Sequence, residues 1–199
     1  ISKNKNIDLI HTIISSMTHR GPDKISTSIY QIGDSYLHLG SARLSITGLS
    51  DGDMPMEDDI GNSLVYNGEI YELENMRNKY NLDLNSKSDT RHLLNILSNQ
   101  NIAELNCLNG MYAFAYFDKK KEKLIIGRDK LGIKPLYFGS NEDFDFYFSS
   151  EIKPLLLNKV IKNRLNENSI KNYLYLGGIT AFEGLFTELH TQMPNSYTI

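Results

Sequence analysis

The segment Met111–Phe117 most narrowly limits how this chain can fold. It reads Met-Tyr-Ala-Phe-Ala-Tyr-Phe, with no charged side chain in the run. An uninterrupted apolar and aromatic run of this length is typical of a strand in the core of a sheet. The chain is therefore expected to fold around at least one well-buried strand.

The remaining pattern predicts several strands and a few helices. Ile7–Met17 has apolar residues at helical spacing, and Gly21 and Pro22 would then end the helix. Further helices are predicted at 73–80, from Ser88 or Asp89 onwards, at 151–157 and at 166–176. Strands are predicted at 26–32, 36–46, 111–117, 124–127 and 144–149, with loops at 47–59 and 118–123.

Strands outnumber helices, and the helices fall at the two ends of the sequence and in one central block. This order predicts a layered α+β fold without a regular strand–helix alternation. The length of 199 residues suits one domain covering 1–199. Residues 186–199 contain a Pro-Asn turn and have no clear ending of their own.

Composition argues against several function classes. The net charge is −3, which disfavours a nucleic-acid-binding surface, and no apolar run approaches the roughly 20 residues of a membrane span. The His residues show no metal-ligand spacing. A single cysteine, Cys107, excludes an internal disulfide and suits a reducing, cytoplasmic compartment.

The segment Leu64–Tyr71 combines strand-forming residues with a polar group of three. Leu64–Tyr66 predicts a strand, and Asn67-Gly68 is a turn signal that Glu69 follows. An amide, a backbone N–H and a carboxylate together could stabilise an oxyanion and accept from an ammonium group. An ordinary hairpin turn is the alternative.

Three other stretches carry charged residues with two interpretations each. Arg43 could bind a substrate carboxylate or form a surface salt bridge. Asp89 could bind an ammonium group or cap a helix. His19 and Arg20 could belong to a site or complement the last turn of a helix.

Eight short motifs occur in this order: His19–Asp23, Ala42–Ile46, Val65–Tyr71, Ser88-Asp89, Gly110–Phe114, Gly127–Asp129, Leu131–Tyr137 and Phe148–Lys153. Taken together, they resemble the glutamine amidotransferase domain of the glutamine-hydrolysing asparagine synthetases, a class II (N-terminal-nucleophile) amidotransferase. The resemblance implies a four-layer αββα sandwich with two packed antiparallel sheets. It also implies hydrolysis of L-glutamine to glutamate and ammonia.

The resemblance further implies a role for each matching residue. Arg43 would bind the glutamine α-carboxylate, and Asp89 would bind the α-ammonium group with Glu69 beside it. Asn67 and Gly68 would form the oxyanion hole. His19 and Arg20 would support the site near the nucleophile.

The family's nucleophile is a cysteine at the mature N-terminus, followed by Gly-Ile, with its own α-amino group as base. This sequence begins at Ile1 and contains no such cysteine before the first expected helix. Loss of a short N-terminal segment is the favoured explanation. Cys107 leads into an apolar strand and is expected to be a small buried core residue.

The family's synthetase domain, which binds ATP and magnesium, is not recognisable before Ile199, and residues 186–199 resemble the connection to it. The expected partners are therefore L-glutamine and a synthetase domain or subunit. No cofactor is expected in this half-reaction, and a homodimer is left open. A non-catalytic glutamine-binding or scaffolding domain without the nucleophile is the alternative function.

Overall fold

The computed structural model describes residues 1–44, 52–71, 73–80, 86, 88–99, 102–178 and 183–199. Its helices are α1 (Ile7–Ser15), α2 (Leu73–Tyr80), α3 (Asp89–Asn99), α4 (Lys153–Leu157), α5 (Glu167–Leu176) and the 3₁₀-helix η1 (Ile102–Cys107). Its strands are β1 (Lys24–Ile32), β2 (Ser35–Arg43), β3 (Met56–Glu57), β4 (Ser63–Ile70), β5 (Gly110–Asp118), β6 (Lys123–Arg128), β7 (Tyr137–Gly139), β8 (Tyr147–Ser149), β9 (His190–Thr191) and β10 (Ser196–Thr198).

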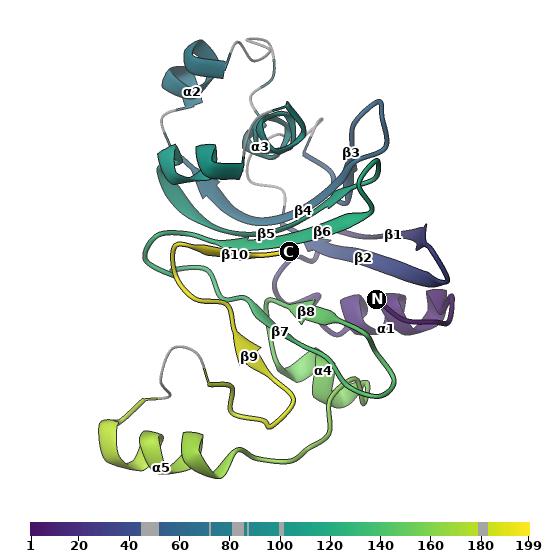
Figure 1. Ribbon diagram of the computed structural model, residues 1–199, viewed down its shortest axis with the longest axis vertical. Helices are drawn as coiled ribbons and strands as arrows, with labels where there is room; N and C mark the ends of the chain where they lie inside the picture. The colour runs from purple at the N-terminus through teal and green to yellow at the C-terminus, as the bar shows by residue number, and fades with distance from the viewer. Residues whose placement is uncertain (45–51, 72, 81–85, 87, 100–101, 179–182) are drawn as a thin grey trace.

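The described strands form three antiparallel sheets. The largest has the order β10-β6-β5-β4-β3, and smaller sheets contain β1-β2 and β8-β7-β9. Helices α2 and α3 lie on one side of the five-stranded sheet, while β1, β2 and α1 lie on the other (Figure 1). The fold is therefore a mixed arrangement of helices and antiparallel sheets, with the large sheet in the middle.

Strands β4 and β5 have buried side chains on both faces of the large sheet. Because successive side chains of a strand point to opposite faces, β5 sends Phe114 towards α3 and Ala115 towards β2. On the α3 side the core contains Leu64, Tyr66, Leu93, Leu94, Ile96, Tyr112, Phe114 and Tyr116. On the β2 side it contains Leu37, Leu39, Val65, Ala113, Ala115, Phe117, Ile126 and Leu136. The expectation of a core strand at 111–117 is confirmed.

Several expected boundaries need correction. The strand expected at 36–46 ends at Arg43, and residues 45–46 lie outside the described part of the chain. The strand expected at 144–149 is confined to β8, because Asn141 Oδ1 accepts from the backbone N–H groups of 143 and 144 and forms a turn there. The loop expected at 47–59 contains the short strand β3, and its first residues, 47–51, are not described.

Gly21 does not cap the first helix, contrary to expectation. Helix α1 ends at Ser15, with Ser16 as its C-cap. At Gly21 the chain passes directly against β2, where an added Cβ would lie 2.4 Å from the Ala42 carbonyl oxygen. The glycine is required by this close backbone approach, which places the loop after α1 beside the end of β2.

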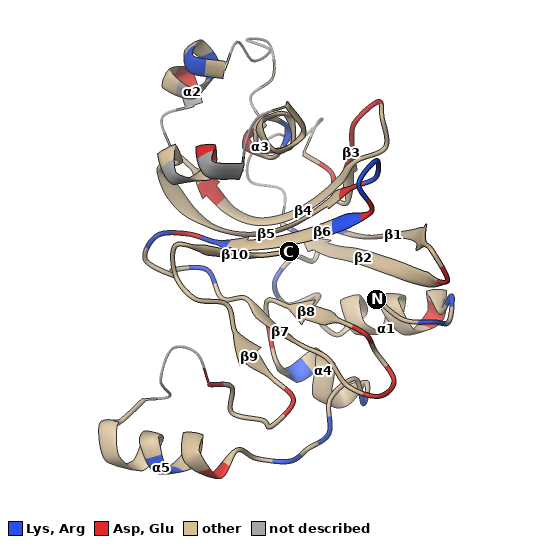
Figure 2. Ribbon diagram, viewed as in Figure 1, with Lys and Arg blue, Asp and Glu red and all other residues tan. Residues whose placement is uncertain are grey.

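Charged side chains lie mainly in loops and helices, with Lys and Arg interspersed among Asp and Glu (Figure 2). Within the described residues, no helix is both long enough and apolar enough to cross a membrane. The last strands of the chain return to the sheets, with β10 pairing with β6. The expectation that residues 186–199 lead into a synthetase domain stays a prediction.

The packing between β2 and the large sheet predicts a stability difference between two leucines. Leu39 is fully buried, whereas Leu131 is 79% exposed. We expect Leu39→Ala to lower the free energy of unfolding by about 2–5 kcal/mol, because it leaves a cavity between the sheets. The matched Leu131→Ala change should stay within about 0.5 kcal/mol. Urea denaturation measures both, and equal effects would contradict this packing.

Candidate functional site

One cavity of about 490 Å³ opens between α1, the ends of β2 and β4, and the segment that leads into β8. The polar residues on its wall include Arg20, Arg43, Asn67, Gly68, Glu69 and Asp89. These six come from four separate stretches of the chain. The fold thus brings together five of the residues expected to bind or activate a substrate, with Arg20 from the supporting pair.

Asn67 and Gly68 do not form the expected turn. Both lie inside β4, opposite Ala113 and Tyr112 of β5. An added Cβ at Gly68 would lie 2.1 Å from the Met111 carbonyl oxygen, so only glycine fits where β4 approaches β5. The turn signal was misleading because tertiary packing, not local turn geometry, requires the glycine.

The side chain of Asn67 carries an unused donor. Its Nδ2 is buried and has no hydrogen-bond partner among the described residues. Leaving such a donor unpaired costs about 1–3 kcal/mol. A ligand oxygen in the adjoining cavity would remove this cost, which is the property that an oxyanion site needs.

Arg43 ends β2, and its side chain is only 8% exposed. Its Nη1 lies 2.6 Å from Oδ1 of Asp53. Asp53 also pairs with Lys24, and these contacts hold the pKa of Asp53 below its usual value, the Lys24 hydrogen bond contributing most. A salt bridge is therefore present, as one interpretation expected, but the guanidinium is buried at the cavity wall.

Asp89 does not cap α3. Ser88 does, since its Oγ accepts from the backbone N–H of Arg91 at 3.3 Å. The Asp89 carboxylate instead accepts from the Tyr66 hydroxyl at 2.8 Å and from the Ile70 backbone N–H at 3.3 Å. Burial, and then the charge of Asp89, raise the pKa of Tyr66, so that hydroxyl remains a donor. This contact fixes a negative charge between α3 and β4.

Glu69 is exposed at the cavity rim, between buried Ile70 and half-buried Gly68. Cys107, in contrast, is not the buried core residue that the sequence suggested. It is the exposed last residue of η1 and does not belong to the described cavity wall. The residues around it form a 3₁₀-helix, which turns its side chain away from the core strand that follows.

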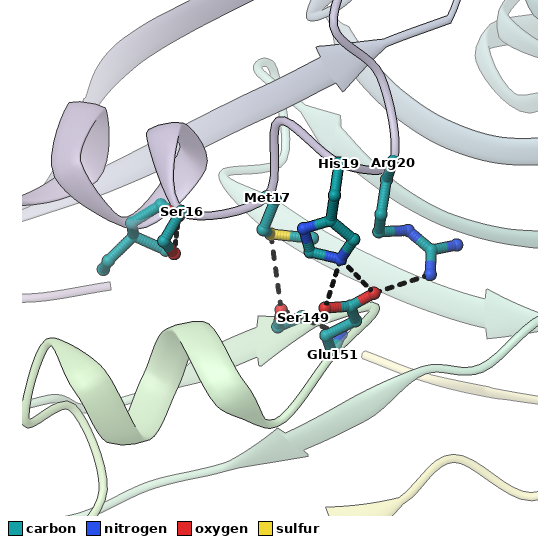
Figure 3. Close-up of polar contacts among 7 residues, drawn as sticks. Ser16, Met17, His19, Arg20, Ser149 and Glu151 are labelled. Carbon is teal, nitrogen blue, oxygen red and sulfur yellow. Dashed lines mark hydrogen bonds and ion pairs between the residues drawn. The ribbon is translucent and has the colours of Figure 1, made fainter.

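His19 and Arg20 lie in the turns after α1 and both contact Glu151 (Figure 3). His19 Nε2 and Arg20 Nη1 lie 3.0 Å and 2.9 Å from Oε1 of Glu151. In the same view, Met17 meets Ser149, with 4.0 Å between Sδ and Oγ. Two stretches far apart in the sequence are thus joined next to the cavity, whose wall includes Met17, Arg20 and Ser149. His19 is not among the described residues of the cavity wall.

Glu151 itself was not expected to belong to the site. It lies within the motif at 148–153, but a lone Glu before a short helix gives no signal of its ion pairs. Burial raises the pKa of Glu151, whereas the hydrogen bonds from Arg20 and His19 lower it by more, so the net shift is downward. Its partners could only be found from the tertiary structure.

The profile of the family described as "Glutamine amidotransferase domain" matches residues 1–199. The chain belongs to this family. Its relatives include putative asparagine synthetase [glutamine-hydrolyzing] 2 of Methanocaldococcus jannaschii, which is 34% identical over 188 residues. Another is asparagine synthetase B [glutamine-hydrolyzing] of Escherichia coli, which is 36% identical over 143 residues. The resemblance to this class II domain is therefore confirmed.

The relatives are much longer than this chain. The alignments cover 85% of this chain and 36% of the archaeal protein, and 70% and 25% for the bacterial one. Among solved structures, the glutamine phosphoribosylpyrophosphate amidotransferase of Bacillus subtilis aligns with a TM-score of 0.58 at 17% identity. That alignment covers 74% of this chain and 40% of the other, and it shows a shared fold.

The ion pairs of Glu151 predict a pH-dependent stability. Because the folded-state pKa is lowered, their contribution is complete above the usual pKa of 4.5 and is lost as the pH falls through the folded value. We expect Glu151→Gln to cost about 1 kcal/mol of unfolding free energy at neutral pH and less at about pH 3.5, below the usual pKa of a glutamate. Denaturation at both pH values measures this.

The control for this comparison is Glu142→Gln, since Glu142 is exposed. It removes the same charge. Because this side chain is exposed to water, the effect on the free energy of unfolding should be small and nearly independent of pH. A Glu151→Gln effect that is equal at both pH values would contradict the assignment of the ion pairs.

Proposed function

We propose that this domain hydrolyses L-glutamine to glutamate and ammonia for an ATP-dependent, amide-forming synthetase domain or subunit. The observation that carries the proposal is the grouping of Arg43, Asn67 and Asp89 around one cavity. The guanidinium suits an α-carboxylate, the Asp89 carboxylate suits an α-ammonium group, and the unpaired amide suits an oxyanion. Glu69 at the rim adds a second acceptor for the ammonium group.

The proposed reaction passes through a thioester. A cysteine thiolate attacks the carboxamide carbon of glutamine, and the oxyanion forms beside Asn67 Nδ2 and the Gly68 backbone N–H. Collapse of this intermediate transfers a proton to the leaving nitrogen and releases ammonia. Water then hydrolyses the thioester to glutamate. The hydrolysis uses no cofactor, and ATP and magnesium would act only in the synthetase part.

The thiol would be supplied by a cysteine ahead of Ile1, and the α-amino group of that cysteine would act as the base. Ser2 and Tyr36 form an antiparallel bridge, with hydrogen bonds of 3.0 Å and 2.7 Å between their backbones. Ile1 then lies opposite Leu37, and each earlier residue of an extended chain would lie one position further along β2. About six such residues would reach Arg43 and the cavity, which supports this placement.

We also infer that the complete domain has the four-layer αββα arrangement. Helix α3 contacts β3, β4 and β5, β2 contacts β4, and α1 contacts β1 and β2. A strand ahead of Ile1 would widen the two-stranded sheet that faces the large one. The order helix, sheet, sheet, helix across the middle of the molecule supports this finer description (Figure 1).

The first experiment is to determine the mature N-terminus of the protein from its full reading frame, by intact mass and N-terminal sequencing. An N-terminal cysteine together with glutamate release from L-glutamine would support the proposal. A mature chain that lacks this cysteine, binds glutamine and releases no glutamate would support the alternative of a glutamine-binding or scaffolding domain. A chain that neither binds nor hydrolyses glutamine would contradict both.

For the active protein, Asn67→Ala should lower kcat by about 10²–10³ with little change in KM, because the lost donor acts on the transition state. Steady-state glutaminase assays measure this. The matched control is Asn99→Ala, which removes the same amide from an exposed position at the end of α3. A rise in KM with unchanged kcat would place Asn67 in ground-state binding instead.

In the same protein, Arg43→Ala should raise the dissociation constant for L-glutamine at least about tenfold, because a hydrogen bond between two charged groups is lost. Calorimetry or the glutaminase KM measures it. Unchanged glutamine binding would contradict the assignment of Arg43 to the α-carboxylate.

A further inference from the structure

Asp53 already supplies a carboxylate to the guanidinium that the proposed function assigns to the substrate. Its Oδ1 lies 2.6 Å from Nη1 of Arg43. Asp53 is not among the described residues of the cavity wall, but its neighbours Gly52 and Met54 line the cavity, so it meets Arg43 next to that wall. Nothing in the motifs of the sequence singled out Asp53.

The two partners of this ion pair differ in their freedom to move. The Arg43 side chain is 8% exposed and the Asp53 side chain is 51% exposed. Arg43 is therefore the fixed partner, while Asp53 can exchange its contact for water at little cost. A residue whose task was to hold Arg43 rigidly would be expected to be packed itself.

Lys24 gives Asp53 a second place to bind. Lys24 lies directly opposite Arg43 in the β1–β2 register, and its Nζ also pairs with Asp53. Two like charges opposite each other in a sheet repel, and the carboxylate between them relieves that repulsion. If a substrate carboxylate took over Arg43, Asp53 would keep Lys24 and would not be left as an unpaired ion.

We propose that Asp53 is a built-in competitor for the substrate α-carboxylate, which must displace it from Arg43. This inference rests on the proposed function. Asp53 partners the buried guanidinium before substrate binds, and Lys24 receives Asp53 when substrate binds. The consequence is that the site binds the substrate α-carboxylate more weakly than Arg43 and Lys24 would without Asp53.

The test uses L-glutamate, the product of the proposed reaction, because it carries the same α-carboxylate and is not hydrolysed. Its dissociation constant is measured by calorimetry on the full-length protein. Asp53→Asn should lower it about three- to tenfold, since the competing charge is gone. The control, Asp59→Asn, removes the same charge from an exposed position in the same segment and should change it less than about twofold.

A second variant separates competition from a direct role of Lys24. Lys24→Met should raise the dissociation constant about twofold or more. Without Lys24, Arg43 is the remaining one of these two cationic partners of Asp53, so the substrate carboxylate displaces Asp53 less easily. In the Asp53→Asn background this penalty should disappear. A penalty that persists there would mean that Lys24 binds the ligand itself, which contradicts its proposed role.

The remaining outcomes are also decisive. If Asp53→Asn binds L-glutamate as tightly as the wild type or more weakly, Asp53 is not a competitor for Arg43. Weaker binding would make Asp53 a positioning residue for Arg43. If neither the wild type nor any variant binds L-glutamate at millimolar concentration, the competitor role is overturned, while the glutaminase assay described above decides separately whether the proposed function holds. The two failures are therefore distinguishable.

Discussion

The rest of this structure depends on the pairing of β4 with β5, two strands whose side chains are buried on both faces of the sheet. A slip of one residue would exchange the side chains that face α3 for those that face β2, so the packing of both cores holds the register. Asn67 and Gly68 stand near the end of this fixed strand, where the apolar pattern stops. An amide donor is thereby held rigidly beside a cavity, and such rigidity is what distinguishes an oxyanion site from a mobile polar loop.

A second constraint comes from Arg128 and Asp129, two charged residues of one motif that act on backbone rather than on ligand. The Asp129 carboxylate accepts from the backbone N–H groups of residues 112, 131, 133 and 134. Burial raises the pKa of Asp129, but these donors outweigh it and lower the pKa overall. Arg128 donates to the carbonyl oxygens of 132, 134 and 192. Together they connect the end of β6 to the segment that enters β10. A motif shared with a family can therefore have a structural role and no catalytic residue.

How far the sequence reached can be judged from particular residues. An uninterrupted apolar run located β5, and a cap signal followed by leucines at helical spacing located α3. Local cap and turn signals failed at Gly21 and Gly68, where the glycine is required by a backbone from another part of the chain and not by a local turn. The partners of Arg43 and Glu151 could not be found either, since Asp53 and His19 reach them through tertiary folding. Cys107 was wrongly expected to be buried because its neighbours are apolar, although η1 turns it outward.

Asn67 and Arg43 show how differently one site can hold a neutral and a charged donor. A buried amide left unpaired costs about 1–3 kcal/mol, which a folded domain tolerates, and Nδ2 of Asn67 has no partner among the described residues. A buried guanidinium without a counter-ion costs several kcal/mol more, and Arg43 is paired with Asp53. A ligand would thus gain fully from the amide but only the difference between two carboxylates from the guanidinium. Under the proposed function, such a site would bind its substrate modestly and keep its largest gain for the oxyanion that forms during reaction.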